Sequence, residues 1–197
     1  MSEPTQSWEP GALLRLETPR FIVRSMTRED VDEAFLGWLA DPEVMLGLNL
    51  PRRQLSRVQA VRWVLGFDNR ARFCLGIYPR PEAAAIGFFT VECDLKNRCA
   101  DTSVVIGERA YWGRNVVIET RGALLDFLFE VMDLHKVTGR PHGRNIASIF
   151  NYKALGFTCE AVLRQQLRSI RDDSRLDQLI FGLLRSEWRA RRAEGKS

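Results

Sequence analysis

The sequence lacks any long hydrophobic run. No window of its 197 residues approaches the ~18 uninterrupted apolar residues of a membrane-spanning helix, so we expect no membrane partner. The N-terminal stretch MSEPTQSWEPG is polar and Pro-rich, unlike a signal peptide or a transit peptide. The length suits one well-packed domain better than two. We therefore expect a single-domain protein of the cytoplasm.

Cysteine and histidine are also scarce. The four cysteines and two histidines do not have the spacing of metal ligands, so the sequence predicts no bound metal. Cys93 and Cys99 flank a predicted hairpin turn, where a disulfide is geometrically allowed. Because disulfides are rare in the reducing cytoplasm, we favour free thiols in apolar surroundings.

Positive charge is concentrated in one segment of the chain. The net charge is +4, and residues 164–197 hold nine basic and five acidic side chains, which accounts for all of it. A basic C-terminus could attract an anionic partner such as RNA. However, this segment has no interleaved aromatic residues that would stack on bases, and short basic tails are more often simply solvated. We do not expect a nucleic-acid partner.

The apolar pattern predicts a mixed α/β sheet. Residues 20–26, 72–79, 84–93 and 99–107 read as antiparallel strands, with two helices in residues 27–68. Thr27 and Ser56 carry the signature of helix N-caps. A helix follows residue 116, then a strand at 135–141, a helix over 145–156 and two last strands. We predict seven strands, mostly antiparallel, with one parallel strand–helix–strand unit at the centre.

The stretch AYWGRNVVIET, residues 110–120, reads as a loop that turns into a helix. The first amides of a helix have no partners within it, so such a junction can bind a phosphate. Ligands of α/β sheets bind at the carboxyl ends of the strands, beside helix N-termini. Phosphate loops usually contain more glycine than this one, so the stretch either still binds a phosphate or keeps the shape of such a loop without the ligand.

The stretch NIASIFNYKALGF places Asn145, Ser148 and Tyr152 at positions i, i+3 and i+7, on one face of a helix. Ile146, Ile149, Phe150 and Lys153 lie on the other side, so the apolar part of the helix can pack into the core. The bland interpretation is an amphipathic helix with Asn145 as its N-cap. We expect Tyr152 to face the crevice beside the parallel strands, where a phenol could donate a proton to a leaving group.

This stretch, N-x-x-S-x-x-x-Y-x-x-L-G-F, is similar to a signature of the GNAT superfamily of N-acetyltransferases. LETPRFIVRSMTREDV resembles the N-terminal block of the ribosomal-protein N-acetyltransferase, or RimJ/RimL-like, branch. YWGRNVVIET resembles that branch's Trp-Gly-Lys-Gly-Tyr-Gly/Ala-Thr-Glu stretch, and DLHKV and LLRSEW match later blocks in order. The resemblance implies a GNAT-fold domain over residues 13–188, between a flexible segment, 1–12, and a basic tail, 189–197.

The resemblance also implies an activity and its residues. The protein would be an enzyme that moves the acetyl group of acetyl-CoA to a primary amine by direct attack, without a metal. The pantetheine arm would bind the backbone of Val104, Val105 and Ile106. The pyrophosphate would bind the loop Trp112, Gly113, Arg114, Asn115, Val116 and Val117. Asn145 and Ser148 would touch the pantetheine and adenosine side, and Tyr152 would protonate the departing thiolate.

The phosphate loop departs from the family pattern, which has Gly at 115 and Gly or Ala at 117. Asn115 can reproduce the turn, because asparagine tolerates positive φ better than other non-glycine residues. The β-branched Val117 could obstruct the phosphate, or its side chain could point into the core. Arg114 adds a cation near the pyrophosphate. The competing hypothesis is a catalytically inactive GNAT-like binding module that has lost the cofactor.

The general base and the acceptor stay open at the level of sequence. Asp101 stands where the branch has Glu, and Glu92, His142 or a water relay are alternatives for deprotonating an ammonium group. The acceptor is a protein N-terminus, an amino sugar or a small-molecule amine. We expect its pocket to be built by the helices of residues 27–68. A homodimer is allowed, but nothing in the sequence selects it.

Overall fold

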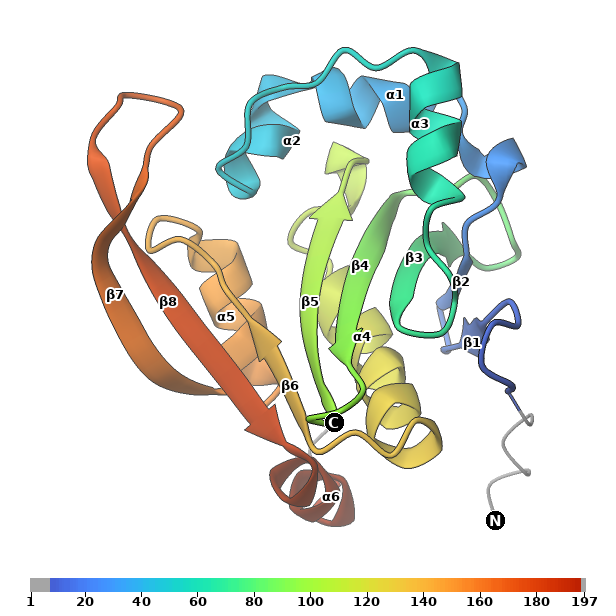
Figure 1. Ribbon diagram of the computed structural model, residues 1–197, viewed down its shortest axis with the longest axis vertical. Helices are drawn as coiled ribbons and strands as arrows, with labels where there is room; N and C mark the ends of the chain where they lie inside the picture. Colours follow the sequence, from blue (N-terminus) through green and yellow to red (C-terminus); the bar gives the residue numbers. More distant parts are fainter. Residues whose placement is uncertain (1–7, 196–197) are drawn as a thin grey trace.

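One mixed sheet of eight strands forms the middle of the molecule in a computed structural model that describes residues 8–195 (Figure 1). Its order is β1-β2-β3-β4-β5-β6-β8-β7. The strands are β1 (Arg15–Glu17), β2 (Phe21–Ser25), β3 (Arg72–Pro79), β4 (Gly87–Asp94), β5 (Cys99–Ile106), β6 (Lys136–Gly139), β7 (Thr158–Arg168) and β8 (Arg175–Leu184). The prediction of seven strands missed β1, a three-residue edge strand too short for a clear alternating pattern.

Within the described residues, β5 and β6 are the parallel pair, and every other pairing is antiparallel. The helix α4 (Val116–Asp126) and the π-helical turn η3 (Phe127–Val131) connect these two strands. The predicted parallel strand–helix–strand unit is therefore confirmed. It lies inside the sheet, with antiparallel strands on both sides.

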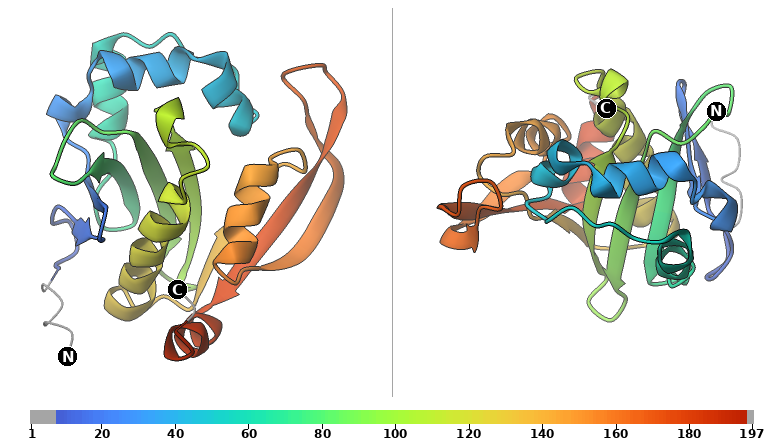
Figure 2. Two further views of the ribbon diagram at one scale, coloured as in Figure 1. Left: turned by 180° about the vertical axis from the view of Figure 1, so that it is seen from behind. Right: turned by 90° about the horizontal axis from the view of Figure 1, so that it is seen from above.

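Helices cover the two faces of the sheet, and the sheet separates two core clusters (Figures 1 and 2). The helices α1 (Glu33–Ala40), α2 (Pro42–Gly47) and α3 (Arg57–Val64) bury one cluster against β4 and β5, centred on Phe35, Trp38 and Phe88. On the other face, α4 and α5 (Ile146–Ala154) bury the larger cluster. The helix α6 (Arg185–Ala193) closes that cluster with Trp188, which is 1% exposed.

The helix starts follow the capping residues, with one difference. Ser56 accepts a hydrogen bond from the backbone of Gln59 and caps α3, as predicted. Thr27 and Asp30 also form a capping box, but it opens the single 3-10 turn η1 (Arg28–Asp30). The helix expected from Thr27 begins only at Glu33, after the side chain of Asp32 accepts a hydrogen bond from the amide of Phe35. The second cap, Asp32, thus places the start of α1 later in the chain than Thr27 predicted.

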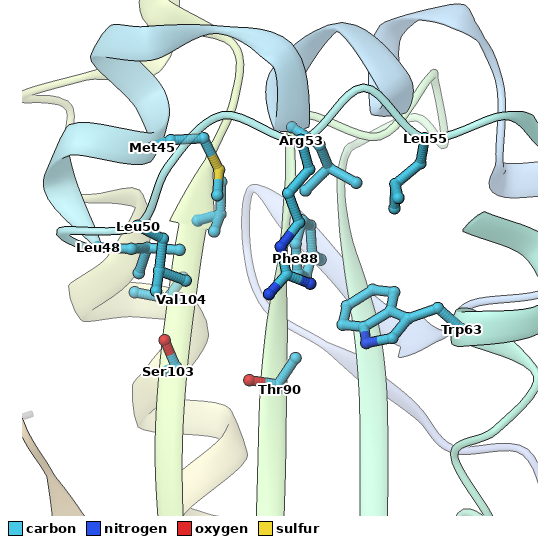
Figure 3. A pocket seen from close by; sticks show the side chains of 12 residues that line it. Met45, Leu48, Leu50, Arg53, Leu55, Trp63, Phe88, Thr90, Ser103 and Val104 are labelled. Carbon is cyan, nitrogen blue, oxygen red and sulfur yellow. The ribbon is translucent and has the colours of Figure 1, made fainter. Parts of the chain in front are cut away.

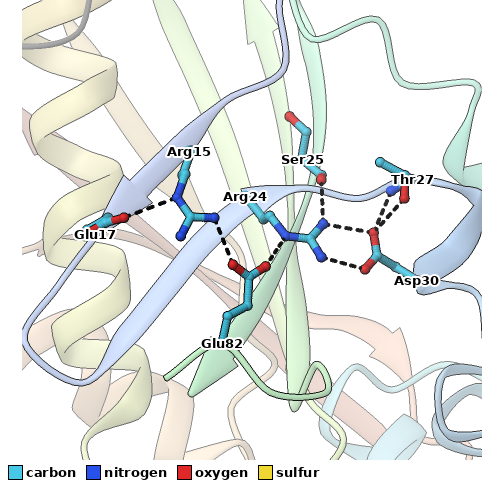
Figure 4. Close-up of polar contacts among 7 residues, drawn as sticks. All are labelled: Arg15, Glu17, Arg24, Ser25, Thr27, Asp30 and Glu82. Carbon is cyan, nitrogen blue, oxygen red and sulfur yellow. Dashed lines mark hydrogen bonds and ion pairs between the residues drawn. The ribbon is translucent and has the colours of Figure 1, made fainter. Parts of the chain in front are cut away.

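Arg24 on β2 joins the first turn to the loop before β4 (Figure 4). Its guanidinium donates two hydrogen bonds of 2.9 Å to Asp30 and one of 2.6 Å to Glu82, and it lies 4.0 Å from the centroid of the Tyr78 ring. Burial alone would raise the pKa of Asp30, but the hydrogen bonds from Arg24 and from the amide of Thr27 outweigh it and lower that pKa. Arg24 therefore connects β2 by ion pairs to η1 and to the loop before β4.

The predicted terminal segments fall partly outside the described residues, at 1–7 and 196–197. Trp8 packs on Phe73 and Phe127, with ring centroids 5.9 and 5.1 Å away. In the C-terminal segment, Arg189 pairs with Glu130 and Arg192 with Asp126. These two arginines of the basic tail thus have acidic partners within the fold.

No helix in residues 8–195 is both long and apolar enough to cross a membrane. The four cysteines are free, including Cys93 and Cys99 at the β4–β5 turn. Burial raises the pKa of Cys93 to about 12, so this thiol is protonated at neutral pH. The expectation of buried thiols holds for Cys74 alone among the four, because Cys93 and Cys99 are partly buried and Cys159 is exposed.

Candidate active site

A fork between β5 and β6 is the first feature of the candidate site. The two strands are paired only from Cys99 to Asp101, and beyond that point they separate. The hydroxyl of Tyr152 donates a 3.1 Å hydrogen bond to the carbonyl of Thr102, and the indole of Trp112 donates one of 2.8 Å to that of Ile106. Backbone groups alternate in direction along a strand, so the amide and carbonyl of Val104 face the same open side. The amide and carbonyl of Val104 can therefore pair with an extended ligand along this edge.

The N-terminus of α4 lies beside this edge. Asn115 has φ 58° and ψ 20°, the left-handed conformation that was predicted for it, and Gly113 has φ 72°. Within residues 8–195, the structure records no acceptor for the amides of residues 115–118. These amides, with the positive end of the helix dipole, form a cradle for an anion.

Val117 occupies the position where the family has Gly or Ala. Its neighbour Val116 is 2% exposed and belongs to the core cluster on the α4 face. Val117 is 8% exposed, and it lines a cavity in front of the amide cradle. Most of the Val117 side chain is thus buried, as expected for a side chain directed to the core, and the remainder borders the cavity in front of the amides.

That cavity has a volume of about 550 Å³ and runs between α2, the end of β5, the loop before α4 and the start of α5. It is lined by residues 104–106 and 112–117 and by Asn145 and Ser148. All the residues predicted to bind the cofactor therefore meet in one cavity, except Tyr152. We call it the cofactor cavity.

The start of α5 forms one wall of the cofactor cavity. Asn145 caps the helix by accepting a 2.9 Å hydrogen bond from the amide of Ser148, and it donates one of 2.6 Å to the carbonyl of Gly47 on α2. The expected core packing of the apolar side of α5 holds for Ile149, which packs against the larger cluster, but not for Ile146 and Phe150, which are 68% and 59% exposed and line the cavity. The core face of α5 is instead the face that carries Tyr152.

Tyr152 lies at the base of the fork rather than in the cavity. It is 2% exposed, and its ring stacks on Phe181 with a centroid distance of 5.2 Å. The guanidinium of Arg121 lies 4.5 Å from the same ring and has no hydrogen-bond partner within the described residues. Sequence reasoning missed Arg121, although a signal was present: it interrupts the apolar stripe that runs from Val117 to Leu124 on α4.

A second cavity, of about 260 Å³, lies on the opposite face of the sheet (Figure 3). Its walls come from the segment between Leu39 and Trp63 and from β4 and β5, so the helices of residues 27–68 do form a pocket. It shares Leu48, Val104 and Val105 with the cofactor cavity. We call it the acceptor cavity, after the role that we propose for it below.

The three candidate bases line neither cavity. Asp101 lies opposite Glu92 in the register of β4 and β5, two residues beyond Ser103 on the same face of the sheet. Its carboxylate accepts hydrogen bonds from Thr138 Oγ1 (2.9 Å) and Arg140 Nε (3.2 Å), and burial raises its pKa. Glu92 is mostly exposed, 3.7 Å from Arg72.

His142, the third candidate, is 7% exposed, and its ring nitrogens have no partner within the described residues. No group of three or more His, Cys, Asp or Glu side chains in residues 8–195 is placed to hold a metal ion. Of the three candidates, Asp101 has a raised pKa and lies on the same strand and the same face of the sheet as Ser103, which lines the acceptor cavity.

Comparisons with known proteins agree with this geometry. Residues 20–158 match the family model of the acetyltransferase (GNAT) domain. The chain is 26% identical over 178 residues to an uncharacterized N-acetyltransferase, p20, from Bacillus licheniformis, covering 88% of this chain and 97% of the relative.

Two solved structures have the same fold. A spermidine N-acetyltransferase from Vibrio cholerae, in complex with CoA and spermine, matches with a TM-score of 0.76 at 16% identity, over 85% of this chain and 97% of the other. A ribosomal-protein-S5-alanine acetyltransferase from Vibrio fischeri matches with 0.75 at 16% identity, over 89% and 98%. Since the family model covers well over half of the sequence, the chain belongs to the GNAT family of acetyltransferases.

Proposed function

We propose that this protein transfers the acetyl group of acetyl-CoA to a primary amine, with the two substrates entering from opposite faces of the sheet. The observation that carries the proposal is the meeting of the two cavities at Leu48, Val104 and Val105. A thioester held along β5 on one side can be attacked there by an amine from the other side. Such proximity converts a bimolecular reaction into an effectively unimolecular one.

The cofactor cavity supplies groups that suit each part of CoA. The amides of residues 115–118 and the side chain of Arg114 suit the pyrophosphate. The amide and carbonyl of Val104 suit the pantetheine arm, which would extend the sheet along its open edge. Exposed aromatic and aliphatic side chains at Trp112, Ile146 and Phe150 provide apolar contact area at the same cavity.

The chemistry needs one proton removed and one supplied. The attacking amine must lose a proton, and we assign its removal to Asp101 through a water, because Asp101 lies two residues beyond Ser103 of the acceptor cavity. The thiolate that leaves must gain a proton, and we assign this step to Tyr152. Its hydroxyl lies at the base of the fork, and its bond to the Thr102 carbonyl would have to open for the transfer.

A transfer assay tests the proposal. Purified protein is incubated with acetyl-CoA and a panel of primary amines, and the free thiol of CoA is followed together with the acetylated amine. We expect amine-dependent release of the thiol, with acetylated product formed in equal amount. Thiol release that does not depend on any amine, or no release with a broad panel, would contradict the proposal.

A further inference from the structure

The acceptor cavity contains one charged side chain, and that charge is positive. Arg53, from the segment between α2 and α3, lines the cavity together with the hydroxyls of Thr90 and Ser103. Figure 3 shows the guanidinium directed towards β4 and β5, above Thr90 and between Trp63 and Val104. No Asp or Glu side chain lines this cavity. The cavity thus carries a single net charge of positive sign.

The Arg53 guanidinium has no ion-pair or hydrogen-bond partner in the described part of the chain. By contrast, Arg109, beside the same helices, pairs with both Asp41 and Glu43. An arginine directed into a cavity without an acid beside it favours a ligand that brings the acid. The planar fork of a guanidinium matches both carboxylate and phosphate with two parallel hydrogen bonds, and carboxylate is the smaller of the two.

The same charge disfavours polycationic acceptors. A polyamine keeps at least one ammonium group besides the one that reacts, and the cavity offers no carboxylate to hold it. Repulsion by Arg53 would add to the cost of burying that charge. For the reacting amine, however, a nearby cation and apolar walls are favourable, because both shift an ammonium group towards the neutral form that attacks.

The size and the remaining walls limit the acceptor further. At about 260 Å³, the cavity is smaller than the ~300–1,000 Å³ usual for drug-sized ligands. Trp63, Phe88, Met45 and four leucines provide most of its wall. A molecule of the size of one amino acid, with an aromatic or branched aliphatic body, fits these dimensions and this chemistry.

We propose that the acceptor is an apolar α-amino acid or a close analogue, whose free carboxylate binds Arg53 while its amine points towards Val104. This inference rests on the proposed acetyl transfer and specifies the acceptor. It distinguishes a free amino acid from a protein N-terminus, in which a neutral amide replaces the carboxylate at the same position.

Matched acceptors test the proposal. Phenylalanine, leucine, methionine and tryptophan are each compared with the corresponding amino-acid amide and with the decarboxylated amine, and spermidine is included as a polycation. Binding of each compound is measured by calorimetry without acetyl-CoA, and turnover is measured separately by thiol release. We expect at least one amino acid to bind and react about tenfold or more better than both of its partners, as for a charged hydrogen bond.

Two variants locate the effect. Arg53→Ala should remove the preference for the acid over the amide, and Arg53→Lys should restore part of it. Arg52→Ala is the control, because this neighbouring arginine is also exposed but does not line the cavity. We expect the control to keep both the preference and the affinity for acetyl-CoA.

The outcomes separate this inference from the proposed function. If acetyl-CoA binds and amines react, but amides or decarboxylated amines do as well as the acids, the carboxylate proposal is overturned and the transfer stands. The same holds if no acid of the panel binds or if Arg53→Ala keeps the preference. Binding of the acids through Arg53 without any acetyl transfer would support the site and contradict the transfer.

Discussion

Replacing Tyr152 with Phe separates the structural role of its hydroxyl from a catalytic one. The substitution keeps the stacking on Phe181 and the contact of Arg121 with the ring, and it removes one neutral 3.1 Å hydrogen bond to the Thr102 carbonyl. Such a bond contributes about 1 kcal/mol to the free energy of unfolding. Loss of a general acid lowers kcat by about 100-fold or more. We therefore expect a small loss of stability and a large loss of kcat.

The assay combines urea unfolding with steady-state kinetics at saturating amine. KM for acetyl-CoA should change little, because the hydroxyl does not line the cofactor cavity. Gly139→Ala is a useful companion, since a Cβ at this position would collide with the Tyr152 hydroxyl and displace it. A Tyr152→Phe variant whose kcat stays within a few-fold of the native value would rule out Tyr152 as the general acid. The hydroxyl would then serve only to satisfy the Thr102 carbonyl.

Three further substitutions probe the phosphate loop, the Arg24 ion pair and the proposed base. Val117→Ala should cost about 1 kcal/mol of stability, because two methyl groups leave a mostly covered site, and should tighten acetyl-CoA binding a few-fold in calorimetry. Arg24→Ala should cost about 2 kcal/mol at neutral pH. Because the pKa of Asp30 is lowered in the fold, this difference should shrink as pH falls below about 4 in urea titrations at several pH values. Asp101→Asn should lower kcat. It should not lower stability at neutral pH, because burial raises the pKa of Asp101, which means that the folded state disfavours the ionised carboxylate. An unchanged affinity for acetyl-CoA would contradict the expectation for Val117→Ala. A loss of stability that is the same at every pH would contradict the one for Arg24→Ala, and an unchanged kcat the one for Asp101→Asn.

Much of the fold could be predicted from the sequence because its signals are local. The strands of the meander alternate clearly, and the Ser56 cap marks α3 directly. Two kinds of feature escaped. The strand β1 has only three residues, and its place at the sheet edge depends on pairing with β2. The start of α1 depended on which of two caps in one segment begins a longer helix.

Only part of the candidate site could be predicted, because its motifs identify the residues but not the directions of their side chains. The left-handed turn at Asn115 followed from its chemistry, and residues 112–117 do line one cavity. The face of α5 that enters the core did not follow, since Tyr152 and Phe150 are both large and aromatic. Which of them is buried depends on the space beside Phe181 and Gly139.

The acceptor cavity was the least predictable part. Arg53 lies in an irregular segment between two helices, where no periodic pattern assigns a direction to a side chain. Its place opposite Thr90 and Ser103 arises only when α1–α3 fold over β4 and β5. The importance of Arg53 becomes visible only in three dimensions, because it depends on the lack of an acidic side chain along the wall of the acceptor cavity.

Calorimetric titration of acetyl-CoA into the native protein is the first experiment to make. We expect saturable binding of one acetyl-CoA per chain with micromolar affinity. Arg114→Ala should weaken this binding about tenfold or more, and Arg62→Ala should leave it unchanged, because that side chain is exposed on α3 and lines neither cavity. This result would mean that Asn115 and Val117 still permit the amide cradle to hold pyrophosphate. Absence of binding by the native chain, with binding recovered only when Val117 is replaced by Ala or Gly, would contradict this expectation and leave a GNAT fold without its cofactor.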